Sequence, residues 1–305
     1  MRGAIAEVAS IAVLIFAISS MLSVGLAYRI HRILRPLKSP RNVFRALAAN
    51  FVLVPLLAIA IERILTLKPS TALGLFLLAA SAGAPFLIKL STAARSDLAV
   101  SAALILLLVP ATVVFLPLYV PLAMAHPTLR GISYLPSSMF ALGVPLLSTM
   151  ILPMLVGFAG RAFAPRWAGR IVPIAGKVAS LSLVVLVVAT LGANVPEVIG
   201  IVREGAILAP LLIVPGAFLS GFMISGSGHG GVLGLGTAQR NIAGAMVIAS
   251  QDFDDPDILV MVTVSSVVSI LILFPIAWLL SKHAPHVGVP TPDLQNRRLH
   301  PAQRR

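Results

Sequence analysis

Residues 221–250 read GFMISGSGHGGVLGLGTAQRNIAGAMVIAS, an apolar stretch that carries Gln239, Arg240 and Asn241 in a row. Arg240 lies eleven residues after His229 and eleven before Gln251, the polar residues on either side of it. On a helix that rises about 1.5 Å per residue, it would lie about 16 Å from each of these two residues. That is the midplane of a hydrocarbon core about 30 Å thick. A charge there costs at least about 2.5 kcal/mol unless it faces a partner or a wet cavity, so the pattern predicts a functional site.

The composition is that of a polytopic membrane protein. The mean hydropathy is +1.00, 58% of the residues are hydrophobic and 11% are charged, which excludes an ordinary soluble domain of this length. The chain has no cysteine, so disulfides and thiolate metal sites are excluded. The formal net charge of +13 would suggest nucleic acid in a soluble protein. Here the basic residues gather in alternate loops, so we expect a lipid bilayer and no nucleic acid as partner.

The hydropathy pattern predicts an all-α fold with nine transmembrane helices. Residues 1–121 would hold four of them as a first repeat, 137–282 would hold five as a second repeat, and 283–305 would form a disordered cytoplasmic tail. The predicted spans are residues 5–27, 43–65, 71–94, 98–121, 137–160, 175–196, 205–225, 230–250 and 257–281.

The charges of the loops predict the orientation. Basic residues crowd 28–45 and 161–177, whereas acidic residues crowd 252–257. By the positive-inside rule, the N-terminus would be outside and the C-terminus cytoplasmic, in a plasma membrane such as the bacterial inner membrane.

An internal repeat emerges when the chain is compared with itself at an offset of about 160 residues. Three short matches share that offset: Val54-Pro55 with Val214-Pro215, 73–75 with 233–235, and Asp97 with Asp257. The equivalent spans are five apart, so the second copy would be inverted in the membrane. Inverted-topology repeats are typical of secondary transporters, whose sites lie near the midplane where the repeats meet.

The third and eighth predicted spans are paired by this repeat, and both contain helix breakers. Gly83 and Pro85 predict an interruption of the third span. Gly234 and Gly236 predict one in the eighth, just before Gln239. We therefore expect two discontinuous helices that cross at the midplane. Tight helix packing is the alternative explanation for the glycines.

The polar residues at this crossing are the candidate substrate- or ion-binding residues. They are Thr237, Gln239, Arg240 and Asn241, with interhelical hydrogen bonding as the alternative role for the two amides. Lys89 is a further candidate, although its side chain could instead snorkel to the nearby interface. The sequence has no HExxH motif, no phosphate-binding loop and no acidic pair in a span, so we expect no enzymatic activity.

Two motifs, GAPFLIKLSTAARSDLAVS at 83–101 and GTAQRNIAGA at 236–245, resemble those of the bile acid:sodium symporter family. The resemblance covers roughly residues 5–282 and implies a nine-helix version of a ten-helix fold, with a core domain that carries the crossed helices and a smaller panel domain. It implies organic anions as substrates, moved with sodium. Ser101 matches a sodium-ligand serine of the family, and Gln239 matches its glutamine.

Several positions depart from the family pattern. These are Leu87 and Ile88 in place of a Ser-Asn pair, Ile105 in place of threonine, Leu235 in place of an acidic residue, and Arg240 in place of the common asparagine. We expect both sodium sites to be largely lost. No cofactor is expected, and sodium is an open but disfavoured coupling ion. The hypothesis is that Arg240, with Lys89, supplies built-in positive charge where the family binds sodium and could also meet a substrate carboxylate.

The expected function is secondary transport of a small or amphipathic organic anion by alternating access. Two alternatives stay open: a proton-coupled or uncoupled uniporter or exporter in the same fold, and a non-transporting membrane sensor or scaffold. The protein could be a monomer or a homodimer.

Overall fold

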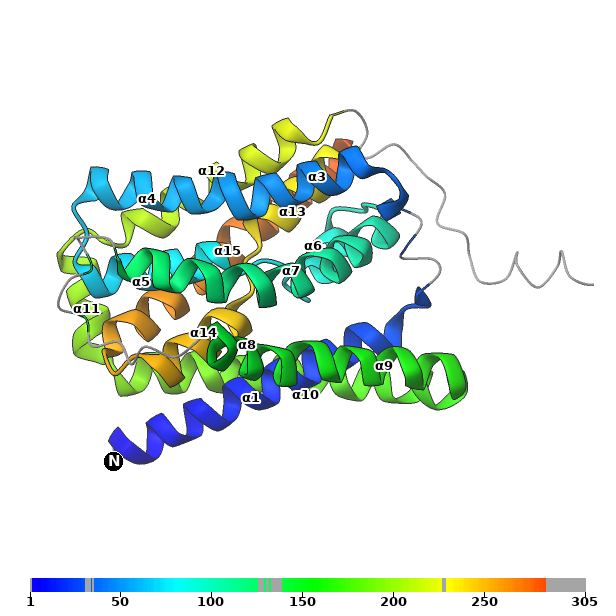
Figure 1. Ribbon diagram of the computed structural model, residues 1–305, viewed down its shortest axis with the longest axis horizontal. Helices are drawn as coiled ribbons and strands as arrows, with labels where there is room; N and C mark the ends of the chain where they lie inside the picture. Colours follow the sequence, from blue (N-terminus) through cyan, green and yellow to red (C-terminus); the bar gives the residue numbers. More distant parts are fainter. Residues whose placement is uncertain are drawn as a thin grey trace, which may run out of the picture.

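The computed structural model describes residues 2–30, 34, 36–125, 129, 132, 139–226 and 229–283, and its regular structure is entirely helical within those ranges (Figure 1). The predicted disordered tail, apart from His283, lies outside the described residues, as do Arg32 and Arg35 of the basic loop. The prediction of an all-helical membrane protein is confirmed for the described part of the chain.

Three long segments form one layer of the molecule, the lower one in Figure 1. They are α1 (Arg2–Ala27), α8 (Met139–Leu146) with its continuation α9 (Leu152–Phe163), and α10 (Pro165–Ala193). We call these four helices the α1–α10 layer. α1 packs along both α9 and α10. Its contact with α9 is backbone to backbone, because a Cβ atom added to Gly25 would lie 2.9 Å from the Cα atom of Gly157.

The remaining helices form a second bundle above this layer (Figure 1). At its centre, α15 packs against α5, α12 and α14. The helices of the second bundle are α3 (Pro40–Ala48), α4 (Val54–Leu65), α5 (Pro69–Ala80), α6 (Leu87–Ala93), α7 (Leu98–Met124), α11 (Val195–Arg203), α12 (Leu208–Ile224), α13 (Gly230–Ala238), α14 (Ile242–Asp252) and α15 (Pro256–His283).

Among the described residues, six helices are long and apolar enough to cross a membrane, and a seventh span results if α11 and α12, bent by 75°, are counted as one. The predicted third and eighth spans are each divided into two short helices, α5 with α6 and α13 with α14. The count of nine spans therefore stays a prediction. The six are Glu7–Ala27, Pro40–Leu65, Leu98–Met124, Ala141–Phe163, Pro165–Ala193 and Pro256–His283.

Two spans contain one π-helical turn each, η2 (Ala49–Leu53) and η4 (Leu147–Ile151). Each turn lies directly before a proline near the start of the next helix, Pro55 in α4 and Pro153 in α9. Proline has no N–H, and its ring clashes with the carbonyl four residues earlier. A local change to the wider π-helix, of a kind often found at functional sites, accommodates this clash.

The interruption of the first broken span lies where the sequence predicts it. α5 ends at Ala80 and α6 begins at Leu87. Between them, Gly83 has a φ of +83°, and a Cβ atom there would lie 2.7 Å from the backbone nitrogen of Val109. Glycine is therefore required at this position both by its backbone conformation and by the close approach of α7.

The second interruption lies later than predicted. α13 continues through Gly234 and Gly236, and the break falls at 239–241. The prediction that these two glycines break the helix is therefore wrong. They allow close packing instead, because a Cβ atom would lie 2.9 Å from Phe218 at Gly234 and 3.2 Å from Leu104 at Gly236.

Candidate functional site

The two interruptions meet in the second bundle. The backbone N–H of Asn241, which precedes α14, donates to the carbonyl of Ser81, which follows α5, at 2.9 Å. The Asn241 side-chain amide lies 3.4 Å from the carbonyl oxygens of Ala82 and Gly83. Thr112 of α7 holds the first interruption from the other side, because its hydroxyl accepts from the Ala82 N–H at 2.9 Å. We call this meeting point the crossing.

Arg240 lies at the crossing and is 5% exposed. A guanidinium group has five N–H donors, and the described residues provide five acceptors. Nε donates to the carbonyl of Leu78 at 3.3 Å, and Nη1 donates to Asn50 Oδ1 at 2.7 Å and to the carbonyl of Thr237 at 3.0 Å. Nη2 donates to the Asn50 carbonyl at 3.3 Å and to the Ala79 carbonyl. Every donor is engaged in this conformation, so none is left for a substrate carboxylate.

Most of these acceptors are available because helices end here. The last four carbonyls of a helix lack partners inside it. α5 ends at Ala80 and α13 ends at Ala238, and Arg240 takes carbonyls from the last turn of each. Both helix C-termini carry a partial negative charge. The guanidinium charge is therefore balanced by two helix ends, and none of its five acceptors is a carboxylate.

The Asn50 carbonyl is available for a different reason, which is the proline that follows. In η2, the N–H of Val54 bonds to the carbonyl of Ala49, five residues back. In the same register, the carbonyl of Asn50 would need an N–H from Pro55, which has none. The carbonyl is left for Arg240.

Asn50 is the site residue that the sequence analysis missed. Its side chain is fully buried and bridges three elements: Oδ1 accepts from Arg240, and Nδ2 donates to the Ala46 carbonyl at 2.9 Å and to Thr237 Oγ1 at 3.2 Å. The available signal was a lone amide inside an apolar span, five residues before Pro55.

A small cavity of about 30 Å³ separates the crossing from the α1–α10 layer. Gln239 and Asn241 line it from the crossing, and Phe16 of α1 and Leu183 of α10 line it from the layer. The volume is that of about one water molecule. The four predicted residues around the second interruption thus lie together and are buried: Thr237 (0% exposed), Gln239 (5%), Arg240 (5%) and Asn241 (1%).

Lys89 and Ser101 lie away from the crossing residues. Lys89 of α6 is exposed, and its ammonium donates to Ser180 Oγ of α10 at 2.8 Å. It thereby links the second bundle to the α1–α10 layer. Ser101 is fully buried at the start of α7, where its hydroxyl bonds to Ser91 Oγ at 2.7 Å and to the Asp97 carbonyl at 2.9 Å. Neither residue is among the hydrogen-bond partners of Arg240.

Comparison with known proteins identifies one family. The family model described as the Sodium Bile acid symporter family matches residues 13–201, from α1 to α11. This range contains the first interruption and the π segment with Asn50, and it ends before α13. No curated protein matches the chain. The family match covers more than half of an integral membrane chain whose interrupted α5–α6 segment lies inside the matched range, and the chain therefore belongs to the sodium bile acid symporter family.

Proposed function

We propose that the protein is a secondary transporter of a small or amphipathic organic anion that works by alternating access, and that the guanidinium of Arg240 occupies the place of a coupling cation. The observation that carries this proposal is the set of five protein acceptors around one buried guanidinium at the crossing. Carbonyl oxygens at helix ends are also the ligands with which interrupted helices hold sodium in transporters. Here the guanidinium of Arg240, a cation that is covalently part of the chain, occupies these carbonyl oxygens.

An inverted repeat with nine spans is part of the proposal. The first interruption follows Ala80 and the second follows Ala238, close to the offset of about 160 residues that relates the two halves of the sequence. Counting α5 with α6 and α13 with α14 as one span each, beside the six long helices and the α11–α12 pair, gives nine. Two interrupted helices in equivalent positions favour a carrier whose substrate binds near the crossing.

The substrate would bind between the crossing and the α1–α10 layer. Gln239 and Asn241 face this boundary, together with Pro85 before α6. The cavity of about 30 Å³ is far too small for an organic anion. We infer an occluded conformation, in which the α1–α10 layer must move relative to the second bundle before a substrate enters.

The oxygen atoms that could hold sodium are engaged elsewhere. Arg240 uses the carbonyls at the ends of α5 and α13, and the hydroxyl of Ser101 is paired with that of Ser91. At the positions of the family's ligands, the apolar Leu87 and Leu235 offer no side-chain oxygen. We therefore propose transport without sodium coupling.

Uptake into proteoliposomes tests this proposal. Benzoate, dodecanoate and cholate, three carboxylates of increasing size, are first screened by thermal shift, and the stabilising ones are radiolabelled for uptake. The same initial rate is expected with sodium or with N-methyl-D-glucamine on both sides. Uptake that requires sodium, or that is driven by an inward sodium gradient in a parallel assay, would refute the proposal.

The variant Arg240→Asn and an internal pH dye complete the experiment. Arg240→Asn restores the amide that the family resemblance places there, and we expect it to abolish sodium-independent uptake. Arg203→Asn, on an exposed arginine of α11, is the matched control and should keep the wild-type rate. Acidification of the lumen that follows the substrate would assign proton symport, and its absence would assign uniport.

A further inference from the structure

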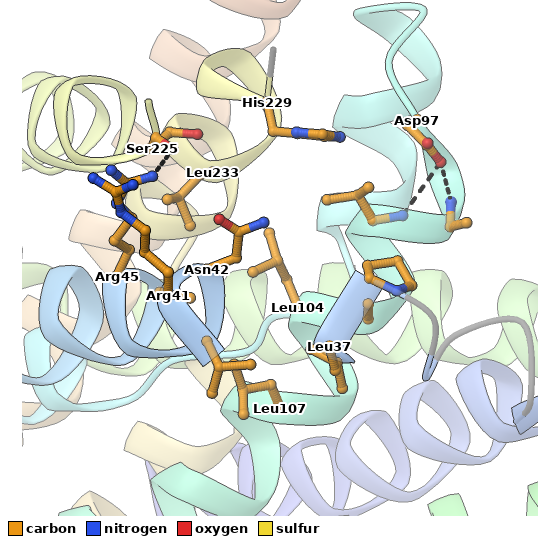
Figure 2. A pocket seen from close by; sticks show the side chains of 16 residues that line it. Leu37, Arg41, Asn42, Arg45, Asp97, Leu104, Leu107, Ser225, His229 and Leu233 are labelled. Carbon is orange, nitrogen blue, oxygen red and sulfur yellow. Dashed lines mark hydrogen bonds between the residues drawn. The ribbon is translucent and has the colours of Figure 1, made fainter. Parts of the chain in front are cut away.

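A cavity of about 720 Å³ lies in the second bundle between α3, α7 and α13, at the end of the molecule where the sequence predicts the cytoplasm (Figure 2). We propose that it binds an anionic amphiphile, that is, a phosphate or carboxylate group joined to an aliphatic chain. Its volume is in the range of small-molecule sites. The inference does not rest on the proposed transport function, because it concerns binding alone.

One wall of the pocket is basic. Arg41 and Arg45 lie one turn apart on α3, and Figure 2 shows both guanidinium groups on the same side of the pocket, close to Ser225. Arg45 Nη1 donates to the Ser225 carbonyl at 2.9 Å. Gly226 packs against this group, because a Cβ atom there would lie 2.7 Å from Nη1, and its φ is +74°.

These two arginines have unused donors. Among the described residues, Arg45 makes that single hydrogen bond, so most of its five donors are available. The described salt bridge of the chain, Lys68–Glu204, involves neither Arg41 nor Arg45. Two guanidinium groups one turn apart, with one of them fixed in place, can hold a phosphate or carboxylate through paired charge-assisted hydrogen bonds.

The pocket also contains one carboxylate, Asp97, at its rim beside His229 (Figure 2). Asp97 caps α7, because its Oδ1 accepts from the N–H groups of Ala99 at 2.7 Å and Val100 at 3.3 Å. The positive end of α7 thus compensates this charge. The basic wall lies across the pocket from the rim, so the positive potential at the arginines is retained.

Apart from Asn42, the remaining lining of the pocket is apolar. Leu104 and Leu107 of α7 form its floor with Leu37, as Figure 2 shows, and Val100 and Leu233 also line the pocket. An inorganic anion would leave this surface uncovered, whereas an aliphatic chain would cover it. Basic pockets between helices at a cytoplasmic membrane surface are typical binding sites for anionic headgroups.

The same chemistry has two sources, an anionic phospholipid of the membrane or a soluble amphiphilic anion, and two assays distinguish them. In native mass spectrometry, phosphatidylglycerol is titrated against phosphatidylcholine with identical acyl chains. In thermal shift, dodecyl phosphate is compared with inorganic phosphate, with the protein in a neutral detergent. We expect at least fivefold preference for phosphatidylglycerol in the first assay, or stabilisation by dodecyl phosphate but not by phosphate in the second.

Two variants and a matched control locate the site. Arg41→Gln with Arg45→Gln should abolish the preference or the stabilisation, and Val100→Trp should do the same by filling the apolar part while leaving both arginines. The control is Arg166→Gln with Arg170→Gln, which removes two exposed arginines with the same spacing from the start of α10.

Each outcome decides the proposal. The proposal is supported if both pocket variants lose the lipid preference or the stabilisation and the control keeps it. A preference for phosphatidylglycerol in the first assay identifies a membrane lipid as the ligand, and stabilisation by dodecyl phosphate in the second identifies a soluble anion. No anion preference in either assay overturns it. Equal loss in the control would also overturn it, because it would indicate a general effect of charge. Stabilisation by inorganic phosphate alone would overturn the requirement for an aliphatic chain.

Discussion

Removal of the guanidinium at the crossing gives a prediction whose magnitude follows from the contacts. Arg240→Met keeps an unbranched side chain of similar length but no donors. The Leu78 carbonyl would keep its bond from the Ser81 N–H at 3.0 Å, whereas Asn50 Oδ1 and the carbonyls of Asn50, Ala79 and Thr237 would lose the donor that Arg240 supplies. Each buried acceptor without a donor costs about 1–3 kcal/mol.

The four losses will not add fully, because a water molecule that enters the vacated space can donate to two of the acceptors. We expect a net loss of about 3–5 kcal/mol, the size found when one partner of a buried charged pair is removed. For a chain of this size, the unfolding midpoint would fall by roughly 10 °C. Thermal unfolding in a neutral detergent, followed by tryptophan fluorescence, measures this change.

A graded series sharpens the test. Arg240→Lys keeps the charge with three donors and should fall between the wild type and Arg240→Met. In Arg240→Ala, guanidinium chloride at about 10–20 mM should raise the midpoint more than sodium chloride of equal strength. Arg203→Ala, on an exposed residue of α11, is the control and should change the midpoint by less than about 2 °C. If Arg240→Met were as stable as this control, the guanidinium would not hold the crossing together.

Two further predictions concern residues around the crossing. Pro55→Ala supplies the N–H that η2 lacks and should draw the Asn50 carbonyl back into its helix. It should lower the unfolding midpoint by a few degrees, and this effect should vanish when the guanidinium is absent, as a double-mutant cycle would measure. Lys89→Met removes the bond to Ser180 between the second bundle and α10. A single cysteine is placed on α10 where this helix lines the cavity next to the crossing. Its labelling by a maleimide should accelerate about two- to fivefold, since exposed polar contacts contribute under about 1 kcal/mol. Lys282→Met is the control, and an unchanged labelling rate in Lys89→Met would contradict the proposal that Lys89 links the two layers.

The first interruption could be predicted because its cause is local. Pro85 lacks an N–H and Gly83 adopts a positive φ, so the sequence itself limits where a helix can continue. The second interruption has no such residue. α13 continues through Gly234 and Gly236, and the chain leaves the helix where the N–H of Asn241 donates to the carbonyl of Ser81. The end of that helix is set by a hydrogen-bond partner about 160 residues away in the sequence. Hydropathy and helix propensity carry no information about so distant a contact.

The environment of Arg240 was also only partly predictable. Its depth in the membrane follows from helix rise and segment length, and the hypothesis of a built-in charge follows from its position. The identity of its partners does not, because four of the five acceptors are backbone carbonyls, which every residue has. Asn50 was missed because a single amide in an apolar span has no periodic pattern around it.

A charge that is part of the chain cannot be released on the far side of the membrane, unlike an ion that is carried along. If the proposal holds and no proton accompanies the substrate, each turnover with a monovalent anion moves one net negative charge. A membrane potential that is negative inside by 100 mV changes the free energy of that step by about 2.3 kcal/mol. The voltage would then drive the anion outward, toward a roughly fiftyfold excess outside, so a carrier whose only cation is part of the chain would act as an exporter.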